Sequence, residues 1–94
     1  MIQLTSDQAI ELHDSKAWEY WSNKRLAAFQ LHQECLCIPF DKFHEAISKT
    51  LDITIFTHQF GNKEIVDDLK SKLPEPSSDD LADMIPLNLI DIFL

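Results

Sequence analysis

Two cysteines and two nearby histidines are the residues whose types and spacing could hold a metal ion. Cys35 and Cys37 are separated by one residue, and His32 precedes Cys35 by three positions, on the same face of a helix. His44 follows the pair. Thiolates and imidazoles are the usual ligands of zinc, but a Cys-x-Cys pair departs from the Cys-x₂₋₄-Cys spacing of common structural zinc sites. Because free cysteines are among the most buried residue types, the sequence favours core cysteines over a metal site, and we expect no cofactor.

A second group of residues could carry acid–base chemistry. His44 and Glu45 are adjacent, and Asp41 and His58 lie nearby in the sequence. Catalysis also needs a nucleophile or a group that stabilises developing charge. The single glycine, Gly61, excludes the glycine-rich loops that cradle phosphates. We therefore predict that the protein is not an enzyme, and that the ring of His44 packs at the edge of the core and caps a neighbouring loop.

Two neighbouring aromatic residues, Tyr20 and Trp21, are candidates for contact with a protein partner. Exposed aromatic side chains dominate the hot spots of protein interfaces. Trp18 and Trp21 stand three residues apart, on one side of a helical turn. Packing in a small core explains Trp18 best. For Tyr20 and Trp21 both interpretations stay open, because they cannot easily share the face of Trp18.

The last twenty residues combine acidic and apolar character. Residues 74–80 have the composition of a linker, and residues 75–94 hold five acidic residues and no basic one. We therefore divide the chain into a helical core, residues 1–74, and a C-terminal segment, residues 75–94. The candidate partner contacts in this segment are Asp79, Asp80, Asp83, Leu89, Ile90, Asp91, Ile92 and Phe93.

Three interpretations of the C-terminal segment are open. Residues 79–94 fold back and complete the core, or they dock on an identical subunit and form a homodimer, since exposed apolar stretches mark association sites. In the third interpretation they form a linear motif for a host protein. Residues 89–93, Leu-Ile-Asp-Ile-Phe, resemble the short peptides that bind bacterial sliding clamps, although the glutamine of those peptides is missing.

Charge and hydropathy limit the possible partners. The chain has 94 residues, with 16 Asp and Glu against 8 Lys and Arg, which gives a formal net charge of −8. This balance excludes general binding to nucleic acid or to an anionic membrane, which requires clustered basic residues. No apolar run approaches the roughly 20 residues of a membrane span, and residues 1–7 lack the features of a secretory signal. We expect a single domain located in the cytoplasm.

Helices must position these residues. Thr5 and Gln8 have the spacing of a capping box, which predicts a helix over residues 6–13. Strong helix formers over residues 24–34 predict a second helix, and its wide apolar face indicates packing on two sides. Asp41 is a candidate cap for a third helix over residues 42–51. The apolar stripe of that helix consists of Phe43, Ala46, Ile47 and Leu51.

The second half of the chain predicts shorter elements. Residues 53–58 are rich in β-branched side chains and indicate one short strand. Residues 63–73 read as an amphipathic helix, and Ser78 can cap a last short helix that ends before Pro86. The fold class that follows is mostly α: a compact bundle of four or five short helices with at most a minor β element.

Several segments of the middle of the chain form a distinctive pattern. They are Leu12–Ser15, Ala28–Leu31, Leu36–Phe40, Phe43–Ala46 and Phe56–Gly61. With this pattern, residues 8–61 resemble an uncharacterised family of short proteins from bacteriophages and prophages. The chain has Cys35 where the family usually has an arginine, and Asp52-Ile53-Thr54 where it usually has Gly-Arg-Pro. The resemblance implies a phage or prophage setting in the bacterial cytoplasm. It implies no particular activity, because the family is uncharacterised.

A small acidic scaffold can be steered onto basic, nucleic-acid-binding surfaces of other proteins and can compete with nucleic acid there. Inhibitors of bacterial defence, including those that block CRISPR complexes, are frequently small acidic phage proteins. We therefore predict a non-catalytic protein that binds and modulates a host protein. The alternatives are a self-associating structural phage protein, a dimer through its C-terminal segment, and a small metal-binding protein. Direct partners among nucleic acids and membranes are not expected.

Overall fold

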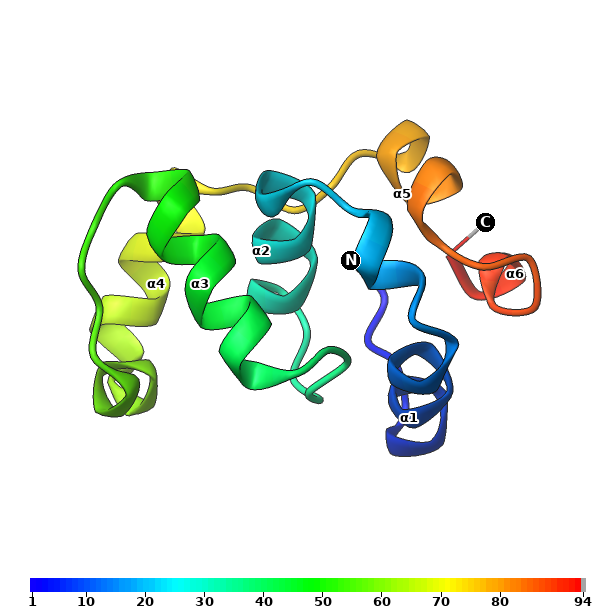
Figure 1. Ribbon diagram of the computed structural model, residues 1–94, viewed down its shortest axis with the longest axis horizontal. Helices are drawn as coiled ribbons and strands as arrows, with labels where there is room; N and C mark the ends of the chain where they lie inside the picture. The colour runs from blue at the N-terminus through cyan, green and yellow to red at the C-terminus, as the bar shows by residue number, and fades with distance from the viewer. Residues whose placement is uncertain (94) are drawn as a thin grey trace.

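The computed structural model describes residues 1–93, which fold as helices joined by short loops (Figure 1). In chain order they are α1 Ser6–Ser15, η1 Ala17–Tyr20, α2 Asn23–Leu31, α3 Phe40–Leu51, η2 Thr57–Gly61, α4 Lys63–Lys72, α5 Ser78–Met84 and α6 Ile90–Phe93. The elements η1 and η2 are 3₁₀ helices. Residues 1–93 contain no strand. The predicted mostly α fold is confirmed, with five α-helices of seven residues or more.

Side-chain caps start the first two helices. The Thr5 hydroxyl accepts from the Gln8 backbone N–H at 3.2 Å, and the Gln8 side chain accepts from the Thr5 N–H at 3.0 Å. This is the predicted capping box. Ser22 caps α2 by accepting from the Arg25 N–H at 3.2 Å. Helix α2 ends at Leu31, earlier than predicted, and residues 32–39 connect it to α3.

Two predicted caps are wrong. Helix α3 starts at Phe40, so Asp41 lies inside its first turn, where its charge is favourable to the helix dipole. The residue before α3 is Pro39, whose φ of −56° suits the start of a helix. Helix α5 is capped by Ser77, which accepts from the Asp80 N–H at 3.1 Å, instead of by Ser78.

The predicted strand over residues 53–58 is also wrong. Residues 53–56 connect α3 to η2, and no segment of residues 1–93 pairs with them as a strand. A β-rich sequence forms a ladder only where a partner strand exists. Ile55 is nevertheless buried, so the apolar character of the segment serves packing against the helices.

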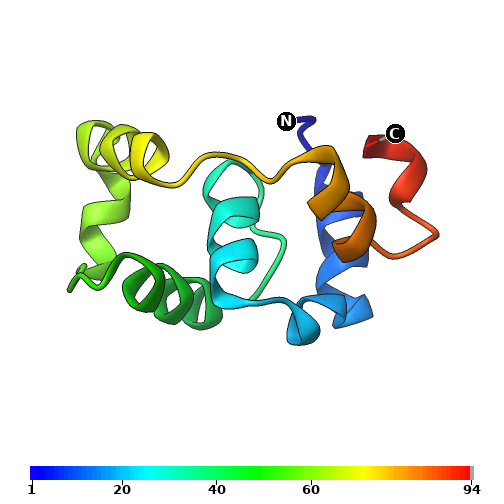
Figure 2. The same cartoon turned by 90° about the horizontal axis from the view of Figure 1, so that it is seen from above.

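Helix α2 occupies the centre of the molecule, between α3 and α4 on one side and η1, α1, α5 and α6 on the other (Figures 1 and 2). All six residues from Leu26 to Leu31 are buried. Most of the apolar ones pack into a first cluster with residues of α3 and α4. Phe29 faces the opposite way, into a second cluster with residues of α1 and α5. The prediction of a central helix contacted from two directions is confirmed.

The C-terminal segment completes the second cluster. The buried members of this cluster are Leu4, Ala9, Leu12, Phe29, Cys37, Leu81, Met84, Ile85 and Leu89. Ile90, Ile92 and Phe93 pack against it from the surface. Of the three interpretations of residues 79–94, the structure therefore supports the one in which they fold back; the last residue of that segment, Leu94, lies outside the described residues. None of the helices in the described chain has the length and apolar character needed to cross a membrane.

Candidate functional site

The two histidines considered as metal ligands are each bonded to a backbone carbonyl. His32 Nε2 donates to the Leu73 oxygen at 2.8 Å, which ties the end of α2 to the end of α4. His44 Nε2 donates to the Ile55 oxygen at 2.5 Å, and its ring stands edge-on to Phe60 at 5.8 Å. The prediction that His44 packs at the core edge and caps a loop is confirmed.

The two cysteines lie in a loop that Gln30 organises. The Gln30 side chain donates to the Cys35 carbonyl at 2.9 Å and accepts from the Cys37 N–H at 2.7 Å. Cys37 is completely buried and Cys35 is partly exposed. Within residues 1–93, no group of three or more His, Cys, Asp or Glu side chains is placed to hold a metal ion. The structure therefore does not bring the four candidate ligands together.

We expect the two thiols to differ in reactivity. Burial, with a smaller contribution from Cys35, raises the pKa of Cys37 from 9.0 to about 12. Because the thiolate is the nucleophile, iodoacetamide at about pH 8 should modify Cys35 in the folded protein and leave Cys37 unmodified. Peptide mass spectrometry checks this, with unfolded protein as the control in which both react. Equal modification of both thiols in the folded protein would contradict the buried position of Cys37.

Three of the predicted partner contacts meet in one hollow between η1 and α5. Tyr20, Trp21 and Asp83 line it, and the hollow has a volume of about 420 Å³. We call it the η1–α5 hollow. Its full lining is Ser15, Ala17, Tyr20, Trp21, Arg25, Asp83, Met84, Ile85, Pro86 and Leu87.

Two large apolar side chains of this hollow are almost fully in solvent. Tyr20 is 90% exposed and Leu87 is 89% exposed, more than any other large hydrophobic residue of the described chain. Sequence reasoning singled out Tyr20 but missed Leu87. Pro86 signals that the helix ends before it, but nothing in the sequence indicates that Leu87 is exposed.

Trp21 forms part of the wall of the hollow and fixes its shape. Its Nε1 donates to the Met84 carbonyl at 3.0 Å, so that the end of η1 is joined to the end of α5. Its ring lies edge-on to Phe29, with centroids 5.3 Å apart. Trp21 is therefore a packing residue that also borders the hollow. Its contact with a partner stays a prediction.

Arg25 joins the hollow to the acidic start of α5. Its guanidinium lies 3.1 Å from an Asp80 carboxylate oxygen and 3.5 Å from one of Asp83. Asp79, beside them, is exposed. Two carboxylates therefore pair with one arginine, which leaves this group of three side chains with a formal charge of −1.

The remaining candidates in the C-terminal segment do not form a free motif. Leu89 is 2% exposed, and Ile90, Ile92 and Phe93 pack against the second cluster. A linear motif must expose the side chains that its partner reads, so the burial of Leu89 contradicts that interpretation of residues 89–93. Asp91 is exposed on α6.

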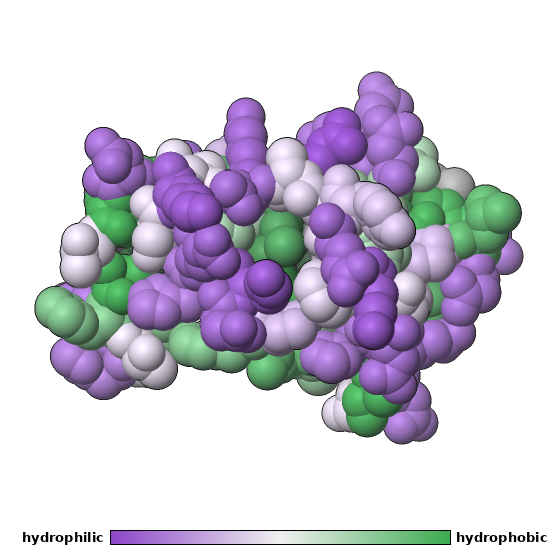
Figure 3. Space-filling model, in the orientation of Figure 1, coloured by the Kyte–Doolittle hydropathy of each residue, from purple (hydrophilic) through white to green (hydrophobic). Residues whose placement is uncertain are grey.

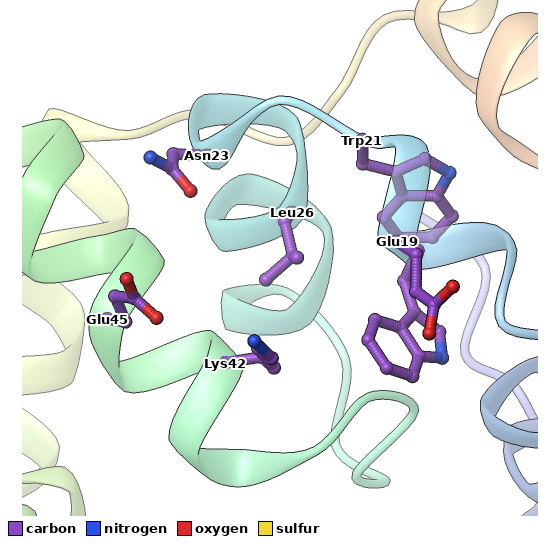
Figure 4. A pocket seen from close by; sticks show the side chains of 7 residues that line it. Glu19, Trp21, Asn23, Leu26, Lys42 and Glu45 are labelled. Carbon is purple, nitrogen blue, oxygen red and sulfur yellow. The ribbon is translucent and has the colours of Figure 1, made fainter.

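A second hollow lies on the other side of η1, over α2. It has a volume of about 390 Å³, and we call it the η1–α3 hollow (Figure 4). In the space-filling view, hydrophilic residues cover most of this face, and a small hydrophobic area lies between them near its middle (Figure 3). The lining residues are Trp18, Glu19, Trp21, Asn23, Leu26, Lys42 and Glu45.

The two hollows therefore flank η1 and share Trp21 as a common wall. Comparisons of the chain with family models, with curated proteins and with solved structures found no match. The chemistry of the two hollows is accordingly the basis for assigning a function.

Proposed function

We propose that this chain is a non-catalytic acidic protein that binds and modulates a host protein in a phage or prophage setting, as an inhibitor of a host activity such as antiviral defence. The observation that carries the proposal is the η1–α5 hollow, where Tyr20 and Leu87 extend into solvent beside the carboxylates of α5. The partner that this surface fits is a protein with a basic, nucleic-acid-binding surface.

The apolar residues of the hollow supply a contact centre. Tyrosine is enriched at hot spots, and it brings a large contact area with few rotatable bonds. Tyr20 and Leu87 are almost completely exposed, so their side chains contribute almost nothing to the stability of the folded chain. Covering them in a complex removes apolar area from water at about 25 cal/mol per Å².

The charge around the hollow favours a basic partner. The chain has a net charge of −8, and residues 75–94 contain no basic residue. The arginine that lines the hollow, Arg25, is already paired with Asp80 and Asp83. Charge complementarity of this kind mainly raises the association rate, and salt screens it over about 8–10 Å.

Capture from bacterial lysate tests the proposal. The immobilised protein should retain a basic protein at about 50 mM salt and release it at about 300 mM salt, because exposed charges are screened. The double variant Tyr20→Ala, Leu87→Ser should lose that protein. A matched double variant, Phe56→Ala with Ile10→Ser, removes two other exposed apolar side chains, which lie outside the hollow, and should retain the captured protein.

Two results would contradict the proposal: equal retention of the basic protein by both double variants, or a set of retained proteins that does not change with salt concentration.

Sedimentation of the purified protein at micromolar concentration distinguishes the proposed function from the self-association alternative. We expect a monomer. A stable dimer that the Tyr20→Ala, Leu87→Ser variant dissociates would assign the same hollow to a second copy of the chain.

A further inference from the structure

The η1–α5 hollow is built from two parts of the chain that lie far apart in the sequence. Tyr20 belongs to η1, whereas Asp83 belongs to α5 and Leu87 follows that helix. The hollow therefore exists only while residues 78–93 lie against η1 and α2. We call these residues the α5–α6 unit, and the way in which the unit is attached decides when the binding surface is present.

The α5–α6 unit is attached through side chains. Within the described chain, no hydrogen bond between two backbone groups joins it to an earlier helix. Trp21 Nε1 donates to the Met84 carbonyl at 3.0 Å. The Arg25 guanidinium pairs with Asp80 at 3.1 Å and with Asp83 at 3.5 Å, and all three side chains are partly exposed. Ion pairs that water reaches stabilise only weakly, so the unit is held mainly by its apolar contacts with the second cluster.

The α5–α6 unit has little helical stability of its own. Its two helices have seven and four residues, and isolated helices shorter than about 12 residues are marginal in water. Residues 74–77, which connect the unit to α4, are not helical and contain two prolines. They run beside α2 (Figure 2). The unit is thus a short, weakly helical piece at the end of a non-helical connection.

The two clusters of the core differ in the parts of the chain that they join. All buried members of the first cluster come from the single stretch of residues 18–73. The buried members of the second cluster come from residues 4–37 and from residues 81–89. Detaching the α5–α6 unit therefore opens the second cluster and leaves the buried members of the first cluster together. Folded proteins open in such partial steps, and weakly packed segments near the chain ends open most readily.

We infer that the α5–α6 unit detaches from η1 and α2 as one piece while α2, α3 and α4 stay folded, and that this step removes the η1–α5 hollow. The role of the hollow in this inference rests on the proposed function, whereas the opening itself requires no partner. A partner that binds only the closed form has an apparent affinity that is lowered by the fraction of open molecules. By the same linkage, the bound partner holds the unit closed.

Amide hydrogen exchange of the unbound protein, followed by NMR at low urea concentrations, tests the opening. The probes in the unit are the hydrogen-bonded amides of Leu81 and Ile85. After correction for intrinsic rates, they should exchange at least about tenfold faster than the amides of α3. Their exchange should also depend less on urea, because a partial opening exposes less surface than global unfolding. Equal rates and equal urea dependence in α5 and α3 would overturn the inference.

The same substitution at two buried isoleucines gives a second test. Ile47 is buried in the first cluster and Ile85 in the second. Ile47→Val should speed exchange in α3 about two- to tenfold and leave α5 unchanged, because the contacts of Ile47 survive the partial opening. Ile85→Val should speed exchange in both helices, because its contacts are lost in partial and in global opening alike. Faster exchange of α5 in Ile47→Val, by the same factor as α3, would overturn the inference.

The two proposals fail in different experiments. Exchange in the unbound protein uses no partner, so a failed capture overturns the proposed function and leaves the opening in place. The absence of a partial step overturns this inference and leaves the hollow as a permanent surface. In a complex with the captured protein, the amide of Leu81, which does not line the hollow, should exchange more slowly, because binding holds the unit closed. An unchanged rate at Leu81 in that complex would contradict the linkage.

Discussion

Replacing Phe29 with alanine is expected to lower the free energy of unfolding by about 3–5 kcal/mol, as for other fully buried phenylalanines. Phe29 has no exposed surface. Its ring packs against Trp21, which follows η1, and against Phe93 of α6, with ring centroids 5.3 Å and 6.0 Å away. It therefore joins the central helix to the segment after η1 and to α6 at the end of the described chain.

Urea unfolding of Phe29→Ala, followed by far-UV circular dichroism, measures this loss. A domain of this size has a total stability of about 5–15 kcal/mol, so the variant should be partly unfolded at 37 °C or close to it. Phe56→Ala is the control, because Phe56 is 61% exposed and its removal should change stability by less than about 0.5 kcal/mol. Similar midpoints for the two variants would show that the second cluster does not support the fold.

The second large effect is expected at Leu89. Leu89→Ala should cost about 2–5 kcal/mol, because this side chain is 2% exposed within the second cluster. Leu87→Ala, two residues earlier and 89% exposed, should cost less than about 0.5 kcal/mol. The pair changes the same residue type in the same segment, so the difference reports burial alone.

Thermal unfolding at two protein concentrations distinguishes the two roles considered for the C-terminal segment. If residues 79–93 complete the core of a monomer, the loss in Leu89→Ala is independent of protein concentration. If they hold a dimer together, the melting temperature rises with concentration and Leu89→Ala removes that dependence. A concentration-dependent loss would contradict the folded-back segment.

The helical part of the fold was predictable because local signals agree with one another. One such signal is the capping box of Thr5 and Gln8. Another is the run of helix formers in α2. Each signal lies within a short stretch of about ten residues, so it can be read without knowing the rest of the fold. The burial of α2 on two sides also follows from its composition. The two wrong caps shifted a helix start by only one or two residues. The larger error occurred where a distant part of the chain decides the outcome. Residues 53–58 have strand propensity, but no partner strand exists for them in the described chain.

The candidate site was predictable only in part. Aromatic type singled out Tyr20 and Trp21, and charge singled out Asp83, but their meeting in one hollow depends on how α5 returns to η1. Leu87 and Leu89 show the limit most clearly. They are identical residues two positions apart, and the turn after Pro86 exposes one and buries the other. The pattern of apolar residues in so short a segment does not predict which of its side chains will be buried in the core.

The central claim is that the η1–α5 hollow is the binding surface. The most direct test is amide hydrogen exchange, measured on the protein alone and in complex with the basic protein recovered by capture. We expect slower exchange on binding in residues 17–25 and 83–88, which border the hollow, and unchanged exchange in residues 52–62 at the far end of the molecule. Slower exchange confined to residues 52–62, with none in the two segments of the hollow, would contradict it.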